Sequence, residues 1–95
     1  MNRRSRVPTS PGEILLEEFL RPLGLTQTAF ARHLGVPVRR VNEIVRGKRA
    51  VSPETAQLFA AALGTSAEFW MNAQSSYDLA THKIDVEIEP LVNVS

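Results

Sequence analysis

The sequence predicts a compact all-α domain of five short helices, and three observations carry this prediction. Apolar residues recur at helical spacing in five separate runs along the chain. Residues that cap or stop helices, mainly Ser, Thr, Pro and Gly, stand between these runs. The connections are about two to five residues long, as is usual when short helices pack together. With 95 residues, 43% of them hydrophobic and 22% charged, the chain fits one globular domain.

The first two helices are predicted from the residues that start and stop them. The first segment begins at Pro11, and we expect Pro22 and Gly24 to stop it, because proline breaks a helix interior and glycine ends one. The second segment has Thr26 as its expected N-cap and ends at Gly35. The apolar positions of the two helices are Ile14, Leu15, Phe19, Leu20, Ala29, Phe30 and Leu34.

The third and fourth helices have similar boundary signals. The third is expected to start at Pro37, a residue favoured in a first helical turn, and to end at Gly47. The fourth opens with Ser52 as N-cap and Pro53 at its first position, and Gly64 terminates it. Their apolar stripes are Val41, Ile44 and Val45 in the third helix and Ala56, Phe59, Ala60 and Leu63 in the fourth.

The fifth helix opens at Thr65 or Ser66 and carries two adjacent aromatic residues near its start. Aromatic residues at helical spacing belong to the core more often than to an exposed patch. We expect Phe69 to point inward and Trp70 to lie toward a domain edge or a dimer contact. The apolar stripe of this helix is Phe69, Trp70, Ala73 and Tyr77.

The C-terminal tail departs from the helical pattern, because "KIDVEIE" alternates apolar and charged residues. This alternation is typical of a short β-strand with Ile84, Val86 and Ile88 on one face, closed by Pro90. A lone strand leaves its backbone groups unpaired, so it needs a partner, such as the same tail of a second chain. The alternative is a polar terminus without fixed structure. The predicted organisation is a basic N-terminal tail at 1–10, a helical domain at 11–82 and this tail at 83–95.

The second and third helices, joined by "GVP", form a candidate helix–turn–helix unit. Gly35 supplies the small turn residue, since its φ can be positive without strain. Ala31 is small enough for one helix to cross the other, and Val41 and Ile44 are spaced to point back into the domain. The outward residues at the start of the third helix occupy the part of a recognition helix that enters the DNA major groove. These residues are Val38, Arg39, Arg40, Asn42 and Glu43.

The charges of this region favour DNA as its partner. The stretch 35–49 holds five basic residues and one acid, although the whole chain has a net charge of only +1. Arg39 and Arg40 can each donate two hydrogen bonds to guanine. Asn42 can pair with adenine, and Val38 can touch a thymine methyl group. The residues expected at backbone phosphates are Gln27, Arg46, Lys48 and Arg49. The alternative is a structural helix pair whose charges are merely solvated.

Composition and spacing argue against several other classes of protein. No cysteine is present and His33 and His82 lie about fifty residues apart, so we expect neither a metal site nor a cofactor. Glu17 and Glu18 face different directions on a helix, which does not suit a catalytic pair, and no nucleophile or phosphate-loop motif occurs. No secretion signal and no apolar run of about 20 residues is found. We therefore expect a cytoplasmic protein that is not an enzyme.

Four stretches carry a resemblance to a known family: "PGEILLEEFLRPLGLTQ", "VNEIVRGKR", "SPETAQLFAAALGTSAEFW" and "NAQSSYDL". Together they cover about residues 10–82. They resemble the phage-repressor-like (XRE) helix–turn–helix domains and, among these, the HigA-type antitoxins, which are the antidote proteins of toxin–antitoxin modules. "PGEIL" and "GTSAEFW" discriminate more sharply than the helix–turn–helix itself, which many repressors share.

The resemblance implies an autoregulator that binds the operator DNA of its own operon as a homodimer. It also implies a protein partner, a HigB-type mRNA-cleaving toxin, which the antitoxin neutralises. By the motif, Gln27 falls at the phosphate-contacting start, and the five residues named above fall on the groove-facing positions. Two alternatives stay open: a stand-alone repressor of the same fold, and a protein-interaction module that has lost DNA binding. The basic N-terminal residues Arg3, Arg4 and Arg6 suit an arm in a DNA groove, an arm against the toxin, or a solubilising tail.

Overall fold

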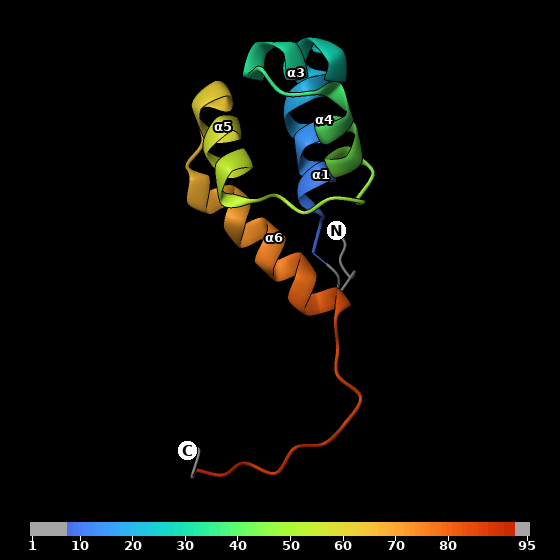
Figure 1. Cartoon of the computed structure of the whole chain (residues 1–95), viewed down its shortest axis with the longest axis vertical. Helices are drawn as coiled ribbons and strands as arrows, with labels where there is room; N and C mark the ends of the chain where they lie inside the picture. Colours follow the sequence, from blue (N-terminus) through green and yellow to red (C-terminus); the bar gives the residue numbers. More distant parts are fainter. Residues whose placement is uncertain (1–7, 93–95) are drawn as a thin grey trace.

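The computed structural model describes residues 8–92, and in this range the chain is all-α (Figure 1). The first helix is a continuous rod in three parts: α1 (Pro11–Ile14), a π-helical stretch η1 (Leu15–Leu20) and α2 (Arg21–Leu23). Four further helices follow: α3 (Gln27–Leu34), α4 (Val38–Val45), α5 (Pro53–Leu63) and α6 (Ala67–Thr81). The prediction of five helices is confirmed. The N-terminal residues Arg3, Arg4 and Arg6 lie outside the described residues.

Serine and threonine hydroxyls cap four of the helices. At the expected caps Thr26 and Ser52, the hydroxyl accepts a hydrogen bond from the backbone N–H three residues later, at 3.0 and 3.2 Å. Ser66 caps α6 in the same way at 3.0 Å, which decides between the two predicted starts. Ser10 caps α1 at 3.2 Å, a cap that the sequence analysis missed. Pro37 differs from the prediction: it is the extended residue before α4, and it offers no side-chain acceptor to cap that helix.

The first helix does not stop at Pro22, contrary to the prediction. It continues through this residue and ends at Gly24. The π-helical stretch explains the difference, because the Arg21 N–H donates to the Leu16 carbonyl five residues back rather than four. The turn before Pro22 is therefore wider than an α-helical turn, and the proline ring avoids the carbonyl with which it would otherwise clash.

Trp70 lies at the centre of the core, with no exposed surface. Its ring centroid is 5.5 Å from that of Phe19 and 5.1 Å from that of Phe59. Phe69 is 41% exposed and packs edge-on against Trp70. The predicted division, with Phe69 inward and Trp70 at an edge, is therefore wrong. The larger ring buries more apolar area, and its indole N–H is satisfied inside the domain by Thr65 Oγ1 at 2.7 Å.

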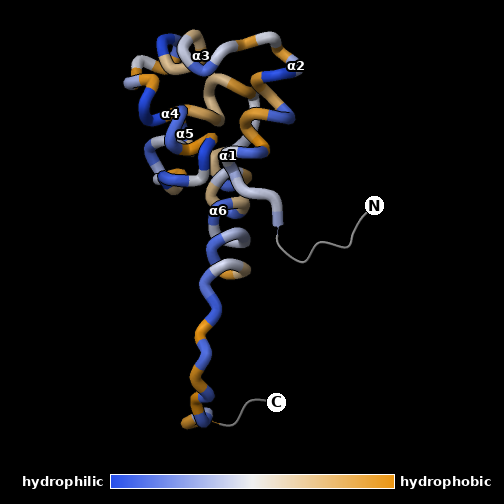
Figure 2. Tube along the Cα trace, turned by 90° about the vertical axis from the view of Figure 1, so that its right-hand side faces the viewer, coloured by the Kyte–Doolittle hydropathy of each residue, from blue (hydrophilic) through white to orange (hydrophobic). Residues whose placement is uncertain are grey.

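The second half of α6 and the tail extend away from the helical bundle (Figures 1 and 2). Residues 83–92 form no strand, and Ile84, Val86 and Ile88 are exposed. The predicted short strand is thus absent from this part of the single chain. The physical reason is that no second strand is present to exchange backbone hydrogen bonds with it.

Gly12 is buried where α1 crosses α4. A Cβ at this position would overlap the carbonyl oxygen of Ile44 and lie only 2.8 Å from the Cα of Val45. The two helix backbones are therefore in direct contact, and a side chain larger than that of glycine does not fit between them. This contact fixes the position of α4 on the first helix.

Replacing Gly12 with alanine is expected to destabilise the fold by about 1–3 kcal/mol, because overpacking forces the two backbones apart. In an uncrowded helix the same change stabilises by about 1 kcal/mol, so the sign of the effect identifies the contact. Thermal unfolding followed by circular dichroism measures it. Ser75→Ala, at an exposed position of α6, is the control for helix propensity alone and should not lower the Tm. A Tm of Gly12→Ala at or above that of the wild type would contradict the contact.

Candidate nucleic-acid interface

The turn between α3 and α4 joins the two helices into one unit. Gly35 has a φ of 77°, in the left-handed region that favours glycine. Its N–H donates to the Arg32 carbonyl, and the Val36 N–H donates to the Ala31 carbonyl, both at 3.1 Å. These two bonds close α3 with a Schellman motif and redirect the chain into α4. Ala31 is buried, as expected for the residue at the helix crossing.

α4 presents one face to the core and its N-terminal end to solvent. Val41 and Ile44 are buried, which confirms their predicted direction. Val38 is 44% exposed, and the Arg39 side chain is 80% exposed. Of the five residues predicted at the groove, these two are the most open. They are therefore the predicted groove residues whose side chains are most accessible to a base edge.

Two other predicted groove residues are engaged within the protein. The Arg40 guanidinium lies 3.6 Å from the Glu54 carboxylate at the start of α5, and its side chain is 27% exposed. Asn42 donates through Nδ2 to Gln27 Oε1 at 3.1 Å. The first contact ties α4 to α5 and the second ties it to α3. Neither pairing could be predicted from spacing in the sequence, because the partners stand on separate helices.

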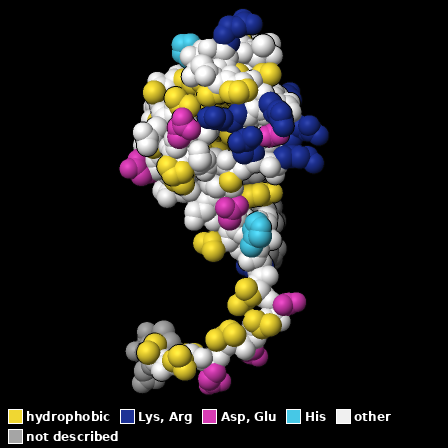
Figure 3. Space-filling model, in the orientation of Figure 1, with side chains coloured by type: hydrophobic (Ala, Val, Ile, Leu, Met, Phe, Trp, Pro, Cys, Tyr) yellow, Lys and Arg dark blue, Asp and Glu magenta, His cyan; other side chains and the backbone are white. Residues whose placement is uncertain are grey.

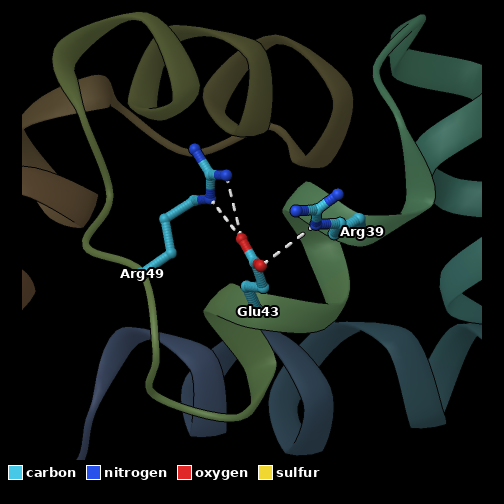
Figure 4. A network of polar contacts seen from close by, with 3 residues as sticks. All are labelled: Arg39, Glu43 and Arg49. Atoms are coloured by element: carbon cyan, nitrogen blue, oxygen red, sulfur yellow. Dashed lines mark hydrogen bonds and ion pairs between the residues drawn. The ribbon is translucent and has the colours of Figure 1, made fainter.

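Glu43, the fifth predicted groove residue, lies between two arginines (Figure 4). Its Oε1 accepts a hydrogen bond from Arg49 Nε at 2.9 Å and lies 2.8 Å from Arg49 Nη2 in an ion pair. Its Oε2 accepts from Arg39 Nε at 3.3 Å. The hydrogen bond from Arg49, reinforced by that from Arg39, holds the pKa of Glu43 below its ordinary value. We call Arg39, Glu43 and Arg49 the Glu43 cluster.

The loop after α4 carries the remaining residues predicted at phosphates. The chain turns at Gly47, whose φ is 74°, and the Lys48 N–H donates to the Glu43 carbonyl at 2.8 Å. The side chains of Arg46 and Lys48 are exposed, and neither forms a salt bridge with a carboxylate among residues 8–92. Figure 3 shows Lys and Arg side chains gathered over α4 and this loop. The cationic surface thus borders the open start of α4.

Gln74 of α6 holds the end of this loop, a role that was not predicted from the sequence. Its Oε1 accepts from the Val51 N–H at 2.8 Å, and its Nε2 donates to Asp78 at 2.9 Å. Val51 is buried, so its N–H needs such a partner. A single glutamine within "NAQSSYDL" has no spacing that points to this role. The stretch does, however, belong to those that carry the family resemblance.

Within the described part of the chain, no group of three or more His, Asp or Glu side chains could hold a metal ion. His33 and His82 are both exposed. None of the helices between residues 8 and 92 is long and apolar enough to cross a membrane.

The turn, the open start of α4 and the cationic loop are those of a helix–turn–helix protein. The family model described as helix-turn-helix matches residues 16–70, more than half of the chain. Antitoxin HigA-1 of Vibrio cholerae serotype O1 is 42% identical over 79 residues, which cover 83% of this chain and 74% of the relative. The structure of Pseudomonas aeruginosa antitoxin HigA with the higBA promoter has a TM-score of 0.82 and 45% identity, with 90% of this chain and 99% of the other covered. The chain belongs to the helix-turn-helix family and, within it, to the HigA-type antitoxins.

Virulence-associated protein I of Dichelobacter nodosus is another relative, 46% identical over 69 residues or 73% of this chain. The chain spans 64% of the length of that protein. The family match confirms the resemblance read from the sequence. It includes α3, α4 and the loop that follows, which together hold all nine predicted DNA-contacting residues.

Replacing Arg49 with alanine is expected to raise the pKa of Glu43, and to raise it more than Arg39→Ala does, because the Arg49 hydrogen bond is the largest cause of the lowered pKa. An NMR titration of the Glu43 carboxyl carbon measures the change. Since the pKa is lowered by folding, the stabilisation is fully present above the unfolded-state pKa and is lost as the pH falls through the folded-state pKa. Arg32→Ala, an exposed arginine outside the cluster, is the matched control. Identical Glu43 titrations in wild type and Arg49→Ala would rule out the cluster in solution.

Proposed function

We propose that this protein is the antitoxin of a type II toxin–antitoxin module. It binds operator DNA as a dimer, represses its own operon and neutralises a co-encoded HigB-type toxin that cleaves mRNA. The similarity to a HigA protein solved with the higBA promoter and to Antitoxin HigA-1 supports this function. Operator DNA and the mRNA that the toxin cleaves are both found in the cytoplasm, so we expect the antitoxin to act there.

The observation that carries the DNA-binding role is the open start of α4 beside a cationic loop. We assign base contacts to Val38 and Arg39, whose side chains are exposed at that start. We assign phosphate contacts to Arg46, Lys48 and Arg49, which follow α4 directly. Because each phosphate contact releases a condensed counterion, operator affinity should fall steeply as the salt concentration rises.

The engaged residues take roles that are compatible with their internal contacts. Gln27 lies in the first turn of α3, where its amide nitrogen can donate to a phosphate while its oxygen holds Asn42. Asn42 is thereby oriented at the edge of the groove, where it can meet an adenine. Both arginines are paired with a carboxylate, but the Arg39 side chain is 80% exposed and that of Arg40 only 27%, so we assign the larger share of base recognition to Arg39.

A dimer fits both the expected operator and the exposed apolar tail. Two recognition helices in successive major grooves stand about 34 Å apart, so the operator should be a near-palindrome. Large apolar side chains are exposed at the end of α6 and along the tail: Leu79, Ile84, Val86, Ile88, Leu91 and Val92. Together with the alternating pattern, their exposure supports pairing of residues 83–95 with the same tail of a second chain.

Two alternative functions use the same fold. A stand-alone repressor would have no toxin gene beside its own gene. A protein-interaction module would keep the fold without binding DNA, and the cationic loop beside α4 counts against it. The antitoxin proposal fails if the adjacent reading frame encodes no small basic ribonuclease-like protein, or if its product does not co-purify with this chain.

Arg39→Ala is expected to lower operator affinity by about 1–3 kcal/mol, because it removes a base-reading side chain. Gel shifts at one fixed salt concentration measure the change. Lys48→Ala should instead weaken the operator and unrelated DNA alike, since a phosphate contact carries no sequence information. Arg32→Ala is the matched control on the exposed face of α3. If Arg39→Ala and Arg40→Ala both bind the operator like wild type, the interaction-module alternative is favoured.

Removal of residues 83–95 is expected to convert the dimer into a monomer, which sedimentation equilibrium can measure. The triple substitution Ile84→Ser, Val86→Ser and Ile88→Ser should have the same effect, because these changes remove only the apolar face that the paired tails would bury. Glu87→Gln changes the opposite face of the same segment and should leave the dimer intact. An unaltered mass for the truncated chain would show that the tail does not hold the dimer together.

A further inference from the structure

A groove lies between the first helix and α6. Two adjoining hollows of about 480 and 360 Å³ form it, and both are lined by Thr9, Ile14 and Phe69. No residue that lines them comes from α3, α4 or the loop after α4. The groove is thus built from elements other than those that carry the predicted DNA contacts.

Phe69 is the apolar anchor of this groove. It remains 41% exposed, although its ring packs edge-on against Trp70 with centroids 5.1 Å apart. Trp70 is itself fully buried, so the wall behind Phe69 is part of the domain core. An exposed aromatic ring on a rigid base loses little side-chain entropy on binding, which is a property of interface hot spots.

The rim of the groove is acidic. Glu13, Glu17 and Glu18 line the larger hollow. Glu17 pairs with Arg21 at 3.4 Å, whereas Glu13 and Glu18 form no salt bridge with any residue between 8 and 92. Carboxylates beside an exposed aromatic ring repel nucleic acid and attract a cationic protein surface.

We propose that this groove binds the cationic surface of the toxin. The inference rests on the proposed antitoxin function and adds the site on this chain that the toxin occupies. An enzyme that cleaves RNA needs cationic side chains against the phosphates of its substrate, and such a surface complements the acidic rim. A second copy that met the groove with the same face would bring like charges together, which disfavours it as the occupant. The groove and the predicted DNA contacts share no residue, so the toxin would not have to displace those side chains to occupy the groove.

The test uses the full-length protein and the purified product of the adjacent toxin gene in isothermal titration calorimetry. Phe69→Asn is expected to weaken binding about thirty-fold, as truncation of a hot-spot anchor does. Glu18→Lys is expected to weaken it about tenfold through charge repulsion. Glu68→Lys makes the same charge change on an exposed glutamate of α6 outside the groove, and should bind like wild type. All three variants should still shift the operator, and Glu18→Lys decides the question if Phe69→Asn does not fold.

The possible outcomes separate this inference from the function on which it rests. If the wild-type protein does not bind the toxin-gene product, the antitoxin function itself fails. If it binds, and both groove variants bind equally well, the groove is not the toxin site. Loss of the dimer in Glu18→Lys with toxin affinity unchanged would assign the groove to a second copy. A lower Tm both in Glu18→Lys and in a chain without residues 1–7, with toxin affinity unchanged, would assign it to the protein's own basic N-terminus.

Discussion

Direct backbone contact between Gly12 and α4 determines where the recognition helix lies. Because no side chain separates the two helices, the carbonyl of Ile44 sits where a Cβ of residue 12 would be. Two buried side chains, Val41 and Ile44, then fix the rotation of α4 about its axis. Val38 and Arg39 are left at the open end of the helix as a consequence. The direction of the predicted base contacts thus follows from a contact made by a residue that is not among the predicted DNA contacts.

The Glu43 cluster changes what the cationic stretch means. Five basic residues and one acid between 35 and 49 suggest an unrestrained positive surface. In the folded chain, however, Glu43 pairs with two of the arginines through its two oxygens, which leaves the three side chains with a net charge of +1. Arg39 and Arg49 are thus each paired with a carboxylate in the free protein. A phosphate that bound either arginine would therefore have to compete with this carboxylate.

Sequence patterns predicted the features that short-range physical chemistry controls. Helix ends depend on a hydroxyl at an N-cap or a glycine at a C-terminus, so Thr26 and Gly35 were placed correctly, as was the helix–turn–helix unit. The predictions that failed concerned side chains whose environment is set by residues distant in the sequence. Trp70 rather than Phe69 enters the core, where Thr65, five residues earlier, accepts its indole N–H. Pairings between helices, such as that of Arg40 with Glu54, produce no periodic pattern in the sequence. For this reason the helical pattern predicted that Arg40 points away from the core, but not that it pairs with α5.

The first turn of the first helix borders both proposed binding surfaces. Pro11 and Gly12 line a cleft of about 210 Å³ together with Lys48 of the cationic loop, whereas Glu13 and Ile14 line the acidic groove. Gly12 is in direct backbone contact with α4. A partner that displaces the first turn of the first helix must therefore either move α4 with it or break this contact. Any such coupling is reciprocal: the factor by which the toxin changes operator affinity equals the factor by which the operator changes toxin affinity. The "PGEI" turn thus adjoins both proposed surfaces, so a partner bound at one of them would act on the other through this turn.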